Sequence, residues 1–166
     1  DFGSVVKGYA ADLLTTYLVD NGVYSAIINL GGNVQTIGTK PDGSDFNVGI
    51  MAPDPNNVTN QNAVSLVANN QAVVTSGINQ RFFISDGVIY HHIIDATTGY
   101  PVQNDLASVT IITEQGINAD LLSTVTFILG LEAGSELIAQ TPNTEAVFIT
   151  RDQVVYPTSS DLDLTV

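Results

Sequence analysis

The pattern of apolar and polar residues predicts a helix at the start of the chain. Over residues 1–21, apolar residues recur every three or four positions, as they do along one face of a helix. These positions are Val5, Val6, Tyr9, Ala10, Leu13, Leu14, Tyr17 and Leu18. Asp1 is placed to cap the first turn, and Gly22 suits the position just after the last one. We therefore predict a helix over residues 1–21.

Short apolar runs between turn residues predict strands through the middle of the chain. Residues 23–40 are predicted to form two strands around Gly31-Gly32, because paired glycines readily take the positive φ angles of a tight turn. A cradle for a phosphate group is the second interpretation of these glycines. The other predicted strands of this part lie at residues 46–52, 63–67 and 71–75, with a polar loop at 53–62 and a hairpin turn at Asn69-Asn70.

Residues 77–102 hold the only two histidines of the chain, at the end of a predicted hairpin. Runs of β-branched and aromatic residues flank Ser85-Asp86-Gly87, and Asp-Gly favours a tight turn between two strands. Successive side chains of a strand point to opposite faces, so His91 and His92 are expected to have different surroundings. One imidazole can then enter a pocket while the other does not. The alternative is a hairpin with two polar edge residues and no chemical role.

The last third of the chain is predicted to add helices as well as strands. The predicted elements are a strand at residues 108–113, helices at 118–129 and 132–140, and a hairpin at 146–156 that turns at Arg151-Asp152. The acidic end at residues 161–166 is expected to be loosely ordered. Many antiparallel strands with three helices predict a single α+β domain over residues 1–166, rather than a doubly wound parallel sheet.

Asp120 and Thr124 are candidates for a metal site. They lie four residues apart in the predicted helix at 118–129, so both fall on one face of its first turns. A carboxylate and a hydroxyl placed in this way can bind a hard cation such as Mg²⁺, which prefers oxygen ligands. The alternative is an acid favoured by the helix dipole and a threonine bonded back to the preceding turn.

Composition and charge narrow the choice of partners. The 166 residues include 17 acidic residues and 4 Lys or Arg residues, and the formal net charge of -13 disfavours binding to nucleic acid and to anionic membranes. An anionic ligand would need a metal ion or helix N-termini to offset this repulsion. Lys7, near the start of the first helix, is useful if an anion binds there, and a solvated lysine is the alternative.

The chain has no cysteine, which excludes disulfides and thiolate metal sites. Its hydrophobic fraction of 44% is enough for a single core. No run approaches the roughly 18 apolar residues that a membrane span requires, and residue 1 opens no signal peptide.

Four segments occur in an order that is typical of one family. They are DFGSVVKGYAAD at 1–12, SAIINLGGNVQTIG at 25–38, TSGINQRFF with DGVIYHHIIDATTGYPV between 75 and 102, and SVTIITEQGINADLLSTVTFILG at 108–130. Together they resemble the ApbE family, the FAD:protein FMN transferases, formerly described as thiamine-biosynthesis lipoproteins. The resemblance covers most of the chain and implies a T-fold-like arrangement of antiparallel sheets and about three packed helices. Proteins of the family are roughly twice as long, and this chain resembles their C-terminal half.

The resemblance also implies a metal site. The A-D-x-x-x-T motif of the family falls on residues 119–124, which makes Asp120 and Thr124 the side-chain ligands of a Mg²⁺ ion. The backbone oxygen that joins these ligands in the family falls on Ser4. Two helix starts, far apart in the sequence, would therefore bind one cation.

The resemblance further implies the residues that contact FAD. The D-x-G-x-x-x-K-G-Y-A motif falls on Asp1 and Lys7, and the H-I-I-D motif places His92 and Ile94 in the cofactor site. His92 is also the implied catalytic base, and His91 is the weaker candidate. Asp95 is expected either to orient His92 or to cap its own turn.

The implied activity is a Mg²⁺-dependent transfer of FMN from FAD to a Thr or Ser hydroxyl of an acceptor protein, with release of AMP. A neutral histidine, with an ordinary pKa near 6.5, can accept the hydroxyl proton. The alternatives are a metal-dependent FAD pyrophosphatase, which gives FMN and AMP, and a non-catalytic flavin-binding module. The family also implies an extracytoplasmic location at the cell envelope, through a lipid anchor outside this segment.

Overall fold

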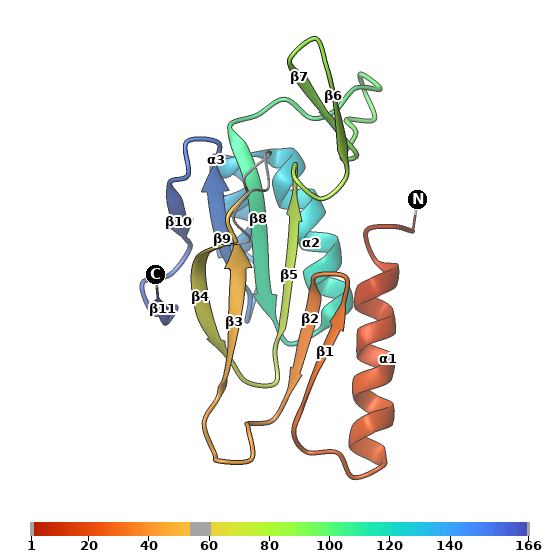
Figure 1. The fold of residues 1–166 in the computed structure, drawn as a ribbon, viewed down its shortest axis with the longest axis vertical. Coiled ribbons are helices and arrows are strands. Elements are labelled where there is room, and N and C mark those ends of the chain that lie inside the picture. The colour runs from red at the N-terminus through yellow and green to blue at the C-terminus, as the bar shows by residue number, and fades with distance from the viewer. Residues whose placement is uncertain (1, 54–60, 166) are drawn as a thin grey trace.

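The computed structural model describes residues 2–53 and 61–165, and Figure 1 shows their arrangement. The helices of this part are α1 (Val6–Asp20), α2 (Gly116–Leu129) and α3 (Leu131–Ala139). The strands are β1 (Ala26–Leu30), β2 (Asn33–Ile37), β3 (Phe46–Met51), β4 (Asn62–Ala68), β5 (Ala72–Gly77), β6 (Phe82–Ser85), β7 (Val88–His91), β8 (Leu106–Thr113), β9 (Glu145–Thr150), β10 (Val155–Pro157) and β11 (Leu164–Thr165). None of the described helices combines the length and the apolar character that a membrane crossing requires.

The described strands form three sheets. A six-stranded sheet has the order β1-β2-β5-β8-β9-β10, a three-stranded sheet has the order β11-β4-β3, and β6 and β7 form a separate two-stranded sheet. Neighbouring strands run antiparallel in each of these sheets. The predicted α+β class, with antiparallel sheets and about three packed helices, is confirmed.

The six-stranded sheet is the middle one of three layers. Its helix-facing side packs against α2 and α3, and this part of the core includes Val74, Ile111, Phe127, Ile138 and Phe148. Its other side packs against β3 and β4, and this part includes Val48, Leu66, Val73, Ile112 and Ile149. Consecutive residues of a strand serve opposite layers, because their side chains alternate. All eight residues of β8 are buried for this reason.

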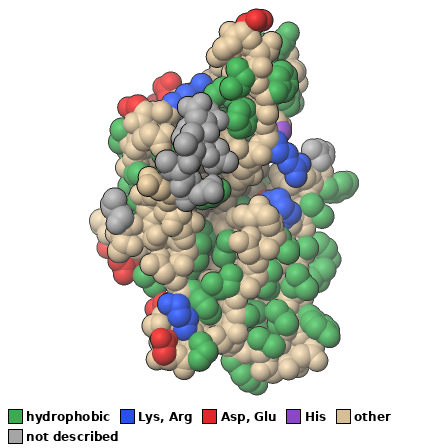
Figure 2. Space-filling view, viewed as in Figure 1, with side chains coloured by type: hydrophobic (Ala, Val, Ile, Leu, Met, Phe, Trp, Pro, Cys, Tyr) green, Lys and Arg blue, Asp and Glu red, His purple; other side chains and the backbone are tan. Residues whose placement is uncertain are grey.

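The helix α1 lies beside β1 and β2 and packs against the start of α2 (Figure 1). Only Gly8 and Ala11 of this helix are buried. Tyr9, Leu13 and Tyr17 are each more than half exposed, and apolar side chains cover this part of the surface in Figure 2. The apolar spacing therefore predicted the helix correctly, although most of these residues do not face the core of the described chain.

Several turns follow the predicted local chemistry. Asp86 and Gly87 both have positive φ angles, 51° and 77°, as the tight hairpin turn between β6 and β7 requires. Gly31 and Gly32 also have positive φ angles and join β1 to β2. Gly22, with a φ of 82°, follows the last turn of α1. These residues confirm the predicted strand breaks and the end of the first helix.

The predicted hairpin of residues 63–67 and 71–75 is wrong. Both strands exist, but β4 pairs with β3, whereas β5 pairs with β2 and β8 in the other sheet. The side-chain Oδ1 of Asn70 accepts a hydrogen bond from N of Gly38 at 2.7 Å. This contact ties the turn to the end of β2, so the chain crosses from one sheet to the other instead of folding back on itself.

Two predicted boundaries also differ from the structure. Helix α1 begins at Val6, with Val5 as its N-cap, rather than at Asp1, which lies outside the described residues. The acidic end was expected to be loose, but residues 164–165 form β11, which pairs with β4. The predicted polar loop at 53–62 falls mostly on residues 54–60, which lie outside the described part of the chain.

Candidate active site where two helices begin

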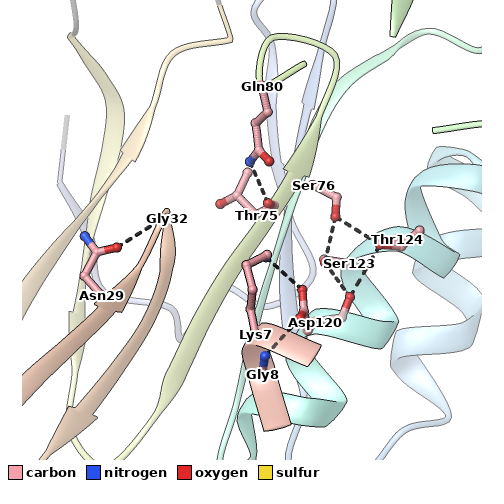
Figure 3. A network of polar contacts seen from close by, with 10 residues as sticks. All are labelled: Lys7, Gly8, Asn29, Gly32, Thr75, Ser76, Gln80, Asp120, Ser123 and Thr124. Carbon is pink, nitrogen blue, oxygen red and sulfur yellow. Dashed lines mark hydrogen bonds and ion pairs between the residues drawn. The ribbon is translucent and has the colours of Figure 1, made fainter. Parts of the chain in front are cut away.

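Asp120 connects the second turn of α2 to the start of α1 (Figure 3). Only 3% of this residue is exposed, and its Oδ2 accepts a hydrogen bond from N of Gly8 at 2.9 Å. Its Oδ1 lies 3.2 Å from Nζ of Lys7 and forms an ion pair with it. Lys7 therefore contacts an anionic group of the chain itself, and its role in cofactor binding stays a prediction.

Hydroxyl groups from β5 and α2 lie next to Asp120 (Figure 3). Oγ of Ser76 lies 2.9 Å from Oγ of Ser123 and 3.2 Å from Oγ1 of Thr124. The Thr124 hydroxyl is 3.5 Å from the Asp120 carbonyl oxygen, which is long for a hydrogen bond. A bond back to the helix is therefore weak for Thr124, and its hydroxyl faces Ser76 as well.

The donor atoms of this site suit a hard cation. Asp120 supplies a carboxylate, and Ser76, Ser123 and Thr124 supply hydroxyl oxygens, which are the ligand types that Mg²⁺ prefers. An ionised carboxylate offers about four lone-pair positions, so its contacts with Gly8 and Lys7 leave room for a further partner. Among residues 2–53 and 61–165, no three His, Cys, Asp or Glu side chains gather around one point.

Two of the three other assigned residues, Ser4 and Ile94, belong to the described part of the chain. Ser4 is half-buried in the turn that precedes α1, at the end of the helix where Gly8 contacts Asp120. Ile94 lies between β7 and β8, is 46% exposed and pairs with Pro101 in an isolated bridge. Asp1 lies outside the described residues. The metal and cofactor roles of these three residues stay predictions.

His92 lies just after β7 and is exposed, and its role as a base and in cofactor binding stays a prediction. Its Nδ1 is 3.3 Å from the carbonyl oxygen of Arg81. A carbonyl can only accept, so the neutral ring holds its proton on Nδ1 and presents the lone pair on Nε2. Although the residue is exposed, partial burial of its ring lowers the pKa of His92. The Arg81 carbonyl opposes this shift, and the positive charges of Arg81 and Lys7 lower the pKa further.

The imidazole of His92 lies within electrostatic reach of two basic side chains. Two of the four Lys and Arg residues of the chain, Lys7 and Arg81, act on this one imidazole. In Figure 2 a histidine has basic side chains close to it, whereas other basic side chains lie elsewhere on the same face. In a chain with a net charge of -13, an anionic ligand would meet these two cations here, of which Lys7 is already paired with Asp120.

His91 has a structural environment. Only 3% of it is exposed, its Nε2 lies 3.1 Å from the carbonyl oxygen of Val102, and its ring meets Phe127 of α2 edge-on. Burial lowers the pKa of His91, so the imidazole is neutral at pH 7 and donates from Nε2. The predicted difference between the two histidines is confirmed, and His91 holds the base of the hairpin against α2.

The stability of the fold should fall as the pH drops below about 6.5. The pKa of His91 is lowered in the folded chain and returns to 6.5 on unfolding, so the unfolded chain binds more protons in this range. His92 acts in the same direction. Urea denaturation at about pH 7.5 and about pH 5.5 should show a smaller loss of stability for His91→Gln, whose amide can still donate to Val102. An identical loss in the variant would rule out His91 as a source.

Asp95 caps its own turn. Its Oδ1 accepts hydrogen bonds from N and Oγ1 of Thr97, at 2.8 and 2.7 Å, and the bond from the Thr97 hydroxyl is the main reason for its lowered pKa. The contact of His92 is with Arg81 instead. Of the two roles expected for Asp95, the structure therefore favours the capping of the turn.

Two residues of this site were missed by the sequence analysis. Asp12 accepts hydrogen bonds from N of Gly116 at 2.7 Å and from N of Ile117 at 2.9 Å, at the start of α2. Ser76 brings a hydroxyl from β5 to Thr124. Both residues lie within segments that carry the family resemblance, which was the available signal, but nothing near them in the sequence reveals a partner on α2.

Solved structures show which class of protein has this fold. The ApbE protein of Thermotoga maritima has a TM-score of 0.81 and 30% sequence identity, over 95% of this chain and 50% of its own. The flavin transferase ApbE of Vibrio cholerae has a TM-score of 0.80 and 29% identity, over 96% of this chain and 50% of its own. The fold is therefore that of the ApbE flavin transferases.

Sequence comparison identifies the family. The model of the ApbE family matches residues 1–148, and the chain belongs to this family. The FAD:protein FMN transferase of Klebsiella pneumoniae is 39% identical over 92% of this chain and 46% of its own length. That of Treponema pallidum is 36% identical over 98% of this chain and 47% of its own length. The chain thus spans about half the length of the curated relatives it matches.

Proposed function

We propose that this chain supplies the cation and general-base side of a site that transfers FMN from FAD to a Thr or Ser hydroxyl of an acceptor protein. The observation that carries the proposal is the buried Asp120 carboxylate, which meets Gly8 and Lys7 at the start of α1 and lies on the same helix face as the Thr124 hydroxyl. The matched relatives are named for this activity. Because the chain spans about half their length, the proposal concerns it within a polypeptide of family length.

Mg²⁺ would be held by Asp120, Thr124 and the carbonyl oxygen of Ser4, with Ser76 next to Thr124. Bound there, the ion would neutralise part of the charge of the FAD pyrophosphate. The buried carboxylate of Asp120 and the hydroxyl oxygens of Ser76 and Thr124 support this assignment. Lys7 would add a second positive charge beside the same phosphates.

The proposed step is an in-line displacement at the phosphorus of the FMN half of FAD. The oxygen of the acceptor hydroxyl forms a bond to this phosphorus, and the bond from the phosphorus to the bridging oxygen breaks. AMP leaves with the bridging oxygen, and the hydroxyl proton moves to Nε2 of His92. The flavin ring is carried through unchanged, so no electron transfer is required.

The product formed from FAD tests the proposed function. A polypeptide of family length that contains this chain is incubated with FAD, Mg²⁺ and an acceptor protein with a target Thr or Ser. We expect in-gel flavin fluorescence on the acceptor and one AMP released for each FMN attached. Replacement of the target residue by alanine in the acceptor should abolish the fluorescence. Absence of covalent flavin, with FAD still bound, would favour a non-catalytic flavin-binding module.

A metal-dependent FAD pyrophosphatase is the second candidate. It is favoured by the exposure of His92, because water can reach the same base that would accept the hydroxyl proton. In the assay above, this activity would release free FMN and AMP and leave the acceptor unlabelled. The location at the cell envelope stays a prediction from the family resemblance.

A further inference from the structure

Each of the two helices at the site is capped by a carboxylate of the other. Neither N-cap residue, Val5 for α1 or Gln115 for α2, caps its helix through its side chain. The amide of Gly8 in α1 is bonded by Asp120 from α2. In return, the first two amides of α2 are bonded by Asp12 from α1, at 2.7 and 2.9 Å. The two helix starts thus satisfy each other's free N–H groups.

The helices cross at two glycines, which brings their backbones into contact. A Cβ atom on Gly8 would lie 2.1 Å from the carbonyl oxygen of Gly116, and one on Gly116 would lie 2.7 Å from the carbonyl oxygen of Gly8. Both distances are too short for any side chain. This contact fixes the distance between the two helices. The hydrogen bonds of Asp12 then fix the position of the first turn of α2 along α1.

We infer that Asp12 is a positioning residue for the proposed cation site. Asp120 lies one turn after Gly116. The amides that donate to Asp12 therefore belong to the first turn of α2, and the position of this turn determines the position of Asp120. When this turn is fixed, the Asp120 carboxylate stays against Gly8 and Lys7, and Thr124 stays against Ser76. Asp12 acts only through α2, because both of its carboxylate oxygens are bonded to amides of that helix. The part of this inference that concerns the cation rests on the proposed function.

Two measurements test the role of Asp12, and both use the whole chain. Calorimetric titration with Mg²⁺ alone measures the cation affinity, and hydrogen exchange followed by NMR measures the protection of the Gly8 amide. In Asp12→Asn, one of the two acceptor oxygens is replaced by an NH₂ group, which cannot accept a hydrogen bond from an amide. One of the two bonds to α2 is therefore lost, while the side chain keeps nearly the same size. We expect the Kd for Mg²⁺ to rise about tenfold to a hundredfold, the usual effect of losing a partner that orients a ligand. We also expect faster exchange of the Gly8 amide.

Matched variants separate positioning from simple stabilisation. Asp20→Asn removes the same charge from an exposed position at the other end of α1 and should change neither measurement. Asp12→Glu keeps the carboxylate and should recover part of the affinity. Gly8→Ala pushes the helices apart without altering Asp12 and should weaken Mg²⁺ binding as well.

Each outcome is decisive for a different part of the inference. Faster exchange at Gly116 and Ile117 alone, with Gly8 protection and Mg²⁺ affinity as in the unaltered chain, would show that Asp12 only caps α2 and would overturn its positioning role. If the unaltered chain binds no Mg²⁺, the metal part of the proposed function fails. The exchange of the Gly8 amide in Asp12→Asn then still decides whether Asp12 positions Asp120, because that bond is present without the cation.

Discussion

Replacement of His92 by alanine should abolish the transfer of FMN to an acceptor protein while FAD binding survives. The neutral imidazole presents Nε2, because Nδ1 is committed to the Arg81 carbonyl, and a general base of this kind typically contributes about a hundredfold to ten-thousandfold in rate. We expect a loss of this size in single-turnover labelling of the acceptor, measured by in-gel flavin fluorescence. Because the pKa of His92 is lowered, the acid limb of the pH profile should have its midpoint below 6.5.

Two further variants sharpen this test. His92→Asn keeps an N–H group that can bond the Arg81 carbonyl but has no basic nitrogen, so it should be as inactive as His92→Ala. His91→Gln should label the acceptor at the normal rate per folded molecule, although its fold is less stable. If His92→Ala labels the acceptor as fast as the unaltered protein does, another group accepts the proton and His92 is not the base.

Local sequence chemistry predicted those parts of the fold that local forces determine. The turn at Asp86-Gly87 requires two positive φ angles, which this pair of residues adopts at low cost. The helix at 118–129 was predicted within two residues of its observed start, because its apolar positions repeat with the helical period. The opposite surroundings of His91 and His92 followed from the alternation of side chains along a strand.

Contacts between distant segments could not be predicted in this way. Periodicity shows that residues 63–67 and 71–75 are strands, but the partner of each strand depends on which sheet buries it, and here Asn70 leads the chain to β2. The exposed apolar side of α1 is a second example, because the spacing of Tyr9 and Leu13 is the same whether or not the described chain covers them.

The candidate site was predicted only in part from local sequence. Asp120 and Thr124 were found from their spacing of four residues, which a helix places on one face. The meeting of the two helix starts was implied only by the family resemblance, and the contact of Asp120 with Lys7, 113 positions away in the chain, was not predicted. Asp12 had no local signal, since an acid within a helix is usually solvated, and its role appears only when α2 is placed beside α1.

Removal of the Asp120 carboxylate should raise the Mg²⁺ concentration that the protein requires by more than about a hundredfold. Loss of a residue that only orients a metal ligand usually lowers the metal affinity by about tenfold to a hundredfold, and loss of the ligand itself should cost more. Asp120→Asn is the informative change, because its side-chain oxygen can still accept the Gly8 amide at nearly constant shape. Asp120→Ala, in contrast, leaves that buried amide without its acceptor and Lys7 without its partner, which should also cost about 1–3 kcal/mol of stability.

The Asp120 prediction is measured by titrating Mg²⁺ against FMN transfer and, separately, against the thermal unfolding midpoint. In the unaltered protein, Mg²⁺ should raise the midpoint, because a ligand that binds only the folded state stabilises it. This rise should vanish in Asp120→Asn and persist in Glu132→Gln, which removes an exposed carboxylate from the neighbouring helix α3. The same Mg²⁺ titration in Asp120→Asn and in the unaltered protein would show that the cation binds elsewhere, and the contact of Lys7 with Asp120 would then be only a structural ion pair.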